Sequence, residues 1–257
     1  MAEANAGNQE HTEPPTPKVV MSIHAHPDDQ EFTVGGTLAK WARAGAQIIT
    51  LCLTEGDAGT NPRMPPPESK EALARTRVDE QIKACEALGI FEAVFFDYPD
   101  GMLEHTIDLR RDVTRQIRKY KPDVVVCGDP TVRFFGDDYM NHPDHRAAAD
   151  AAVDAVFPSA GTLFIFPELL EEGFQPHEVR EVYLFGSEQP NTFIDTSEVL
   201  AVKIAALREH RSQLGDWDPT EMVTQWAARQ GEARGLKAAE SYRRMVLVRD
   251  EEGQATS

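Results

Sequence analysis

The sequence is short of positive charge. Its 257 residues include 43 acidic and only 26 basic ones, which gives a formal net charge of −17. The phosphates of nucleic acid would repel such a chain, and no run of five or more basic residues offsets the repulsion. We therefore expect no nucleic-acid partner.

Long apolar runs are also missing. The longest, such as Val124–Cys127, are the size of a strand, whereas a transmembrane helix needs about 20 apolar residues. The first 18 residues are polar and lack the apolar stretch of a secretory signal. The sequence predicts no membrane association. It also predicts disordered tails at residues 1–18 and 249–257, on either side of a single domain at 19–248.

Cysteine is scarce as well. Cys52, Cys85 and Cys127 lie in apolar segments, and no two of them have CxxC spacing. This odd and scattered set is typical of buried, reduced thiols in a cytoplasmic protein. Sulfur is therefore not expected to hold a metal.

What the sequence does contain is an alternation of strand-like and helix-like segments. This pattern predicts an α/β fold with a Rossmann-like, mostly parallel sheet, helices on both faces and a less regular α+β C-terminal part. The breaker-rich Gly56–Ser69 segment is expected to form a long surface loop, and such loops are often lids. Strands are expected at 19–25, 47–54, 93–96, 123–127, 181–185 and 192–194, and helices at 37–44, 71–88, 106–120, 142–156, 199–214 and 221–234.

Two short His/Asp clusters carry the chemistry. Residues 26–29 read His-Pro-Asp-Asp and residues 142–145 read His-Pro-Asp-His, and each follows an expected strand. Ligands bind outside the carboxyl ends of parallel strands, so the two clusters can meet in space. Imidazole and carboxylate are what a catalytic zinc takes, usually three from the protein plus a water. Each cluster can give two ligands and keep an acid/base group, and Asp144 could orient a histidine of its own cluster.

Plainer interpretations exist for each motif. Either cluster alone fits a helix start, and Gly35-Gly36, without GxGxxG, fits a tight turn that allows close helix packing. Arg77 and Glu80 fit a surface ion pair, and 97–101 fits a turn. A structural metal site or a non-catalytic sugar- or nucleotide-binding module are the rival functions. Structural zinc usually has four protein ligands, often cysteines, so an open catalytic site is favoured.

Taken together, these residues resemble the PIG-L or LmbE-like family of zinc-dependent N-deacetylases. Residues 24–39 are similar to the family's AHPDDE…GGT pattern, and 141–146 to its HPDH pattern. Weaker matches include the helix with Arg77 and the segment Pro99-Asp100-Gly101, so that the likeness spans residues 19–245. One departure is Gln30, where many members have Glu; here Glu31 follows it. This departure argues against assignment to the mycothiol branch.

The resemblance implies removal of an N-acetyl group from an N-acetylglucosamine-type sugar or glycoconjugate. An amidase acting on another acyl-amino sugar or on a thiol conjugate has the same metal site. Zinc is the expected metal, although His/Asp ligation also suits Fe²⁺ or Mn²⁺, and a homotrimer or homohexamer is expected. By position, the ligands would be His26, Asp29 and His145, the general base Asp28, the oxyanion-stabilising or amine-protonating residue His142, and the sugar or acyl contacts Arg77 and Asp100.

Overall fold

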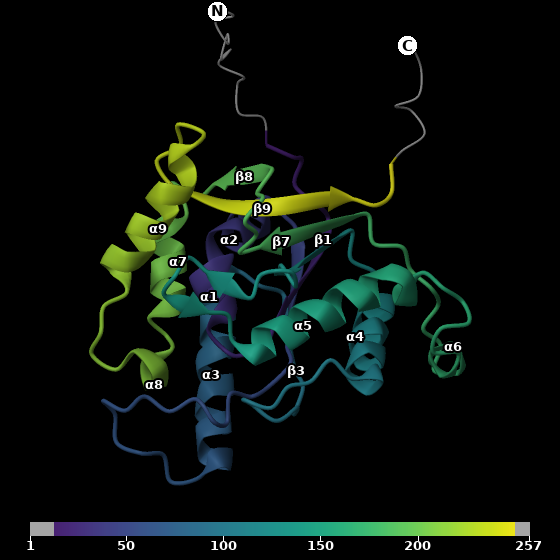
Figure 1. The fold of residues 1–257 in the computed structure, drawn as a ribbon, viewed down its shortest axis with the longest axis horizontal. Helices are drawn as coiled ribbons and strands as arrows, with labels where there is room; N and C mark the ends of the chain where they lie inside the picture. Colours follow the sequence, from purple (N-terminus) through teal and green to yellow (C-terminus); the bar gives the residue numbers. More distant parts are fainter. Residues whose placement is uncertain (1–12, 250–257) are drawn as a thin grey trace, which may run out of the picture.

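The computed structural model describes residues 13–249 and has a seven-stranded sheet at its centre (Figure 1). The strand order is β3-β2-β1-β4-β7-β9-β8, and β9 runs antiparallel to the other six strands. The predicted mostly parallel α/β fold is therefore confirmed. The strands are β1 (Val19–His24), β2 (Gln47–Cys52), β3 (Glu92–Phe95), β4 (Val124–Gly128), β7 (Glu181–Phe185), β8 (Thr192–Asp195) and β9 (Ala239–Val246), with a separate hairpin of β5 (Phe134–Phe135) and β6 (Tyr139–Met140).

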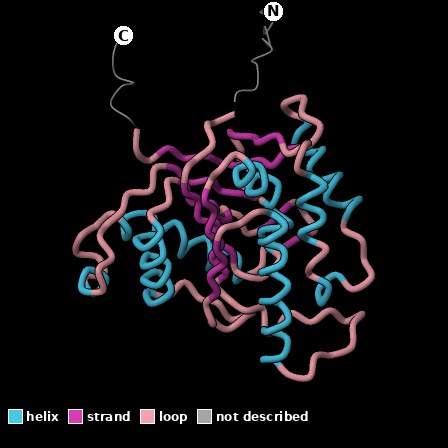
Figure 2. Tube along the Cα trace, turned by 180° about the vertical axis from the view of Figure 1, so that it is seen from behind, coloured by secondary structure: helices cyan, strands magenta, loops and turns pink. Residues whose placement is uncertain are grey.

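Helices cover both faces of the sheet (Figures 1 and 2). Alternate side chains of β1 point to opposite faces, so that Met21 packs in the core under α4 and α5, and Val20 in the core under α2. The helices are α1 (Asp29–Thr33), α2 (Gly35–Arg43), α3 (Lys70–Leu88), α4 (Ile107–Tyr120), α5 (Pro143–Asp154), the π-helix η1 (Ala155–Ala160), α6 (Glu168–Glu171), α7 (Leu200–Leu207), α8 (Arg211–Leu214) and α9 (Thr220–Glu232).

The Gly35-Gly36 pair is explained by strand β9. The carboxylate of Glu240 accepts hydrogen bonds from the amides of Gly36 and Thr37, at 2.9 and 2.7 Å. A Cβ atom on Gly36 would lie 2.7 Å from the Thr196 methyl group, so only glycine fits there. The predicted close packing is confirmed, but Gly35 and Gly36 are the first residues of α2 and form no tight turn before it. The protein's own carboxylate occupies the place where a nucleotide phosphate could bind.

The structure departs from the predicted elements at one long helix and adds several short elements and one strand. The helix expected at 199–214 is two helices, α7 and α8, because His210 leaves helical geometry at φ −78° and ψ 57°. Strand β9, the β5–β6 hairpin and the short helices α1 and α6 were not predicted.

Part of the expected N-terminal tail contacts the domain. Glu13, inside the expected N-terminal tail, pairs with Lys40 at 2.7 Å; residues 1–12 and 250–257 lie outside the described residues. All three cysteines are buried and free, as predicted, while the cytoplasmic location stays a prediction. Among residues 13–249, no helix is long and apolar enough to cross a membrane.

Candidate functional site

The neighbouring strands β1 and β4 bring the two His/Asp clusters together. His26 Nδ1 lies 3.3 Å from His145 Nε2, which in turn lies 3.0 Å from Asp29 Oδ1. The third pair, His26 Nδ1 and Asp29 Oδ2, is 3.5 Å apart. Three ligand atoms from two distant segments thus converge within 4.8 Å of one another, and this group could hold a metal ion.

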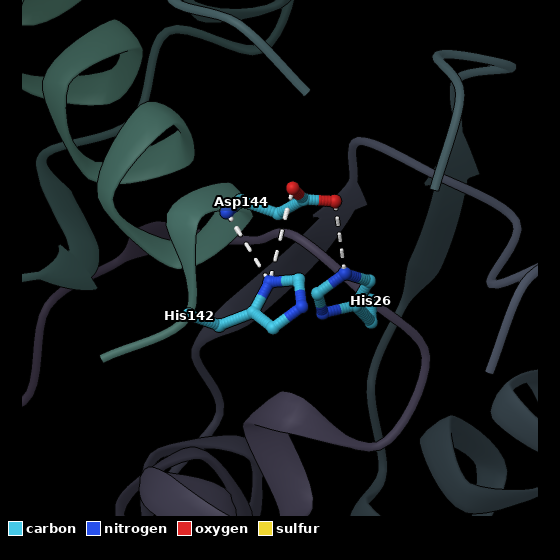
Figure 3. Close-up of side chains that lie close together, drawn as sticks. All are labelled: His26, His142 and Asp144. Atoms are coloured by element: carbon cyan, nitrogen blue, oxygen red, sulfur yellow. Dashed lines mark hydrogen bonds and ion pairs between the residues drawn. The ribbon is translucent and has the colours of Figure 1, made fainter. Parts of the chain in front are cut away.

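A second group shares His26 and adds His142 and Asp144 (Figure 3). The oxygens of Asp144 are largely taken, because they accept hydrogen bonds from the amides of Gly101 at 2.7 Å and Leu103 at 3.3 Å. The Asp144 side chain is also fully buried. The first group, with partly exposed Asp29 and His145, therefore offers the more available ligand atoms.

The outer nitrogens of the two histidines in the first group bind protein acceptors. His26 Nε2 lies 3.2 Å from Asp144 Oδ2 and 3.0 Å from Asp100 Oδ1. His145 Nδ1 lies 3.3 Å from Asn141 Oδ1. In the neutral rings that a metal would require, these contacts place the protons on the outer nitrogens and leave His26 Nδ1 and His145 Nε2 as lone-pair donors, as in many metal sites.

The role of Asp144 in orienting a histidine of its own cluster stays a prediction. Its carboxylate lies 3.8 Å from His142 Nδ1 and contacts His26 of the other cluster at 3.2 Å. Helix α5 packs against β1, which brings its first turn close to the other cluster.

The electrostatics of the site suit a cation. Burial alone would lower the pKa of His26, but the carboxylates of Asp29, Asp100 and Asp144 raise it to about 12. Burial would raise the pKa of Asp29, yet His145 and His26 hold it well below its usual range. Three carboxylates around one imidazole form a negative pocket that favours positive charge.

Asp28 stands beside this group at the start of α1. It has a left-handed backbone at φ 94°, and its side chain makes no capping hydrogen bond. Arg77 Nη2 donates to Asp28 Oδ2 at 3.2 Å and to the carbonyl of Pro27 at 2.6 Å. Burial raises the pKa of Asp28 to about 6, with Arg77 acting in the opposite direction.

His142 lies at the mouth of the site and starts α5. Its Nδ1 accepts a hydrogen bond from the amide of Asp144 at 3.2 Å, so the neutral ring carries its proton on Nε2. Burial and the nearby His26 lower the pKa of His142. The side chain is 41% exposed, so Nε2–H is a donor accessible to a bound molecule.

Arg77 and Asp100 are held by protein groups. Both are buried, and Asp100 Oδ2 accepts from the amide of Ala58 at 2.9 Å. Arg77 also donates to the carbonyl of Gly56 at 3.0 Å. The prediction of a surface ion pair between Arg77 and Glu80 is wrong, because Glu80 is buried and its carboxylate accepts hydrogen bonds from Ser212. A sugar contact by Arg77 or Asp100 stays a prediction.

The Gly56–Ser69 loop lies against Arg77 and is tied to α8. Asn61 Nδ2 donates to the Gln213 carbonyl at 2.8 Å, and Gln213 Nε2 donates back to the Gly59 carbonyl at 2.9 Å. A Cβ atom on Gly59 would lie 2.2 Å from Arg77 Nη1. Between this loop and α3 there is a cavity of about 550 Å³, with Asn61, Met64 and Thr76 in its wall.

Sequence reasoning missed two residues that support the site. Asn141 holds His145, and its position directly before the second cluster was an available signal. Gln81 accepts the Asp28 amide hydrogen bond at 2.8 Å, and nothing in its sequence context distinguishes it from an ordinary helix residue.

The fold and this site define a class, an α/β protein with a His/Asp group able to hold one metal ion at the carboxyl ends of its parallel strands. Residues 21–156 match the family described as PIG-L, GlcNAc-PI de-N-acetylase, and the chain belongs to this family.

Two curated relatives and one solved structure illustrate the likeness. The chain is 33% identical to diacetylchitobiose deacetylase of Thermococcus kodakarensis, over 79% of this chain and 74% of the relative. It is 25% identical to 1D-myo-inositol 2-acetamido-2-deoxy-alpha-D-glucopyranoside deacetylase 1 of Saccharopolyspora erythraea, over 93% of each chain. The solved N,N'-diacetylchitobiose deacetylase of Pyrococcus horikoshii superposes with a TM-score of 0.81 at 30% identity, over 90% of this chain and 84% of the other.

Proposed function

We propose that this chain is a metal-dependent hydrolase that removes the acetyl group from an N-acetylglucosamine-type sugar or glycoconjugate. The observation that carries the proposal is the convergence of His26 Nδ1, Asp29 and His145 Nε2 within 4.8 Å, with Asp28 beside them. The names of the relatives supply the substrate class, since they are deacetylases of diacetylchitobiose and of an inositol-linked acetamido sugar.

The donor set fits zinc. Two imidazole nitrogens and one carboxylate are three protein ligands, which is the number that a catalytic zinc takes while it keeps an open position. The same donors accept Fe²⁺ or Mn²⁺. Zinc held there would polarise the acetamide carbonyl and lower the pKa of the attacking water.

Asp28 is the proposed general base. Its carboxylate accepts the proton of the attacking water and later delivers it to the nitrogen of the leaving amine, so that acetate and a free amine are the products. Arg77 keeps this carboxylate in place through its hydrogen bonds to Asp28 and to the Pro27 carbonyl. The pKa of about 6 leaves Asp28 mostly ionised near pH 7 and still able to take up a proton.

His142 is the proposed oxyanion donor. Because its Nδ1 accepts from the Asp144 amide, its neutral form offers Nε2–H to the carbonyl oxygen on which negative charge develops. A neutral donor satisfies this role, so the proton for the amine comes from Asp28. Asp100 and Asp144 support the site by accepting from His26 Nε2.

Two alternatives are separated by experiment. An amidase for another acyl-amino sugar or a thiol conjugate would have the same metal group. A nucleotide-binding module is disfavoured because Glu240 fills the helix start at Gly35-Gly36. A sugar-binding module would have no need of the Asp28 carboxylate beside the metal group. The Gly56–Ser69 loop beside Arg77 is the segment proposed to select the substrate, and shortening it should change the preference between mono- and disaccharides.

The deciding experiment measures metal per chain by elemental analysis and acetate release from N-acetylglucosamine, diacetylchitobiose and N-acetylglucosaminyl-inositol. We expect about one zinc per chain, acetate from at least one sugar, loss on chelation and recovery with zinc. His145→Ala should lose the metal. Bound metal without acetate from any of the sugars would favour the other amidases, and failure to bind metal would leave the binding module.

A further inference from the structure

The start of α1 lacks an ordinary cap. An N-cap residue usually has an extended backbone, and its side chain accepts a hydrogen bond from an amide of the first turn. Asp28 holds this position with φ 94° and ψ −26° and makes no such bond. This conformation is uncommon for a residue with a side chain and persists only where neighbours enforce it. Some contact must therefore hold the Asp28 backbone.

Gln81 of α3 makes that contact. Its Oε1 accepts the Asp28 amide hydrogen bond at 2.8 Å, and its Nε2 donates to Glu31 Oε1 at 3.0 Å. Glu31 is the third residue of α1, and its other oxygen lies 3.1 Å from His210 Nε2. Gln81, Glu31 and His210 are all buried.

These contacts form a capping box with one extra member. In the usual motif, a Glu at the third helical position accepts the N-cap amide directly. Here Gln81 stands between Glu31 and the amide of Asp28. The amide of Glu31, which an N-cap side chain would usually bind, donates to the Asp28 carbonyl at 3.1 Å. The Asp28 carboxylate caps nothing and binds Arg77.

We propose that Gln81 is a positioning residue for the deacetylation, which holds Asp28 in its left-handed conformation so that the carboxylate serves proton transfer and does not cap α1. This inference rests on the proposed function for its catalytic consequence. Its structural half, the restraint on the Asp28 backbone, stands on the contacts alone.

Gln30 provides a matched control. It is as buried as Gln81, at 1% exposure, and its Nε2 donates to the same Glu31 oxygen at 2.6 Å. Both glutamines also contact Cys85 Sγ. Only their acceptor oxygens differ, because Gln30 Oε1 accepts from Thr50 Oγ1 and does not reach Asp28.

The test compares Gln81→Met with Gln30→Met in the metal-loaded protein. Small displacements of a catalytic group cost up to about 100-fold in rate, so we expect Gln81→Met to lower kcat by about 10- to 100-fold with KM and metal content unchanged. Gln30→Met should keep kcat near that of the wild type. Hydrogen exchange of the Asp28 amide should accelerate in Gln81→Met only.

The unfolding free energy guards against a general packing defect. Gln81→Met and Gln30→Met each remove a buried amide that donates to Glu31, so the two variants should lose similar stability. Equal losses of kcat in the two variants would overturn the proposal. Unchanged kcat and unchanged amide exchange in Gln81→Met would also overturn it. If the wild type releases no acetate, the proposed function fails, and the exchange measurement still decides whether Gln81 restrains Asp28.

Discussion

Two helix starts in the same part of the chain use carboxylates in opposite ways. At α2, Glu240 reaches the amides of Gly36 and Thr37, and Lys203 Nζ binds it at 2.6 Å. Both of its oxygens are used, and the residue is 2% exposed. At α1, the Asp28 carboxylate makes no cap and its side chain is 15% exposed.

The difference shows that a carboxylate at a helix start can either stabilise the fold or remain available for catalysis. A carboxylate at a helix start is stabilised by the amides and by the helix dipole. When every acceptor site is filled, as at Glu240, the group locks two elements together and cannot exchange a proton with a ligand. When a neighbour such as Gln81 holds the backbone of the N-cap residue and the side chain makes no cap, the carboxylate keeps an accessible oxygen.

The largest expected effect is the loss of activity when the Asp28 carboxylate is removed. Asp28→Asn should lower kcat by about 10³-fold, because general acid–base groups contribute on this scale, while metal content and unfolding free energy stay near those of the wild type. Steady-state kinetics and elemental analysis measure this. Activity close to that of the wild type in Asp28→Asn would remove the proposed contrast.

The second prediction is the converse, a loss of stability. Glu240→Gln leaves Lys203 buried without its counter-charge and should cost about 3–5 kcal/mol in unfolding free energy, measured by denaturant titration. The folded fraction should keep its kcat. Asp218→Asn, which breaks the exposed pair with Arg208, is the control and should leave the unfolding free energy close to that of the wild type.

A smaller effect is expected at the support of His26. Asp144→Asn weakens the acceptor for His26 Nε2 and should reduce metal affinity by about 10- to 100-fold, the usual range for such supporting groups. Chelator competition measures the affinity. Asp150→Asn, on the exposed side of the same helix, should leave it unchanged, and equal losses in both variants would point to a general effect on α5.

The smallest effect concerns pH and the far end of the Gln81 contacts. Burial would lower the pKa of His210, but Glu31 raises it above 6.5. A raised pKa means that the stabilisation is full below pH 6.5 and is lost as the pH rises through the folded value. The wild type should therefore exceed His210→Gln by about 1 kcal/mol at pH 6, and this margin should shrink towards pH 9. A margin independent of pH would show that His210 is neutral.

Sequence patterns predicted the parallel half of the fold well, because β1, β2 and β4 are apolar runs that are almost wholly buried. Strand β9 escaped because its buried polar residue, Glu240, looks like a surface residue until Lys203 is placed beside it. The split of the helix at His210 could not be predicted either, because His210 binds Glu31, which lies 179 residues away in the sequence.

In the site, too, local patterns were predictable and contacts between distant segments were not. Both clusters could be predicted to meet, because strand-end residues gather at one sheet edge. The partners of Asp144, Asp100 and Arg77 could not, since they depend on how α5 and the loops pack. The fine geometry of Asp28 depends on Gln81, which no motif marks.

The contact between Glu240 and Gly36 spans 204 residues. During synthesis, the start of α2 leaves the ribosome long before the strand that caps it, so this helix start has to wait for nearly the whole chain. Long-range contacts of this kind slow folding and lengthen the time during which apolar surface is exposed. A premature stop codon before residue 240 would therefore remove more than an edge of the protein: it would leave the first βα unit, which carries His26 and Asp28, without its final anchor.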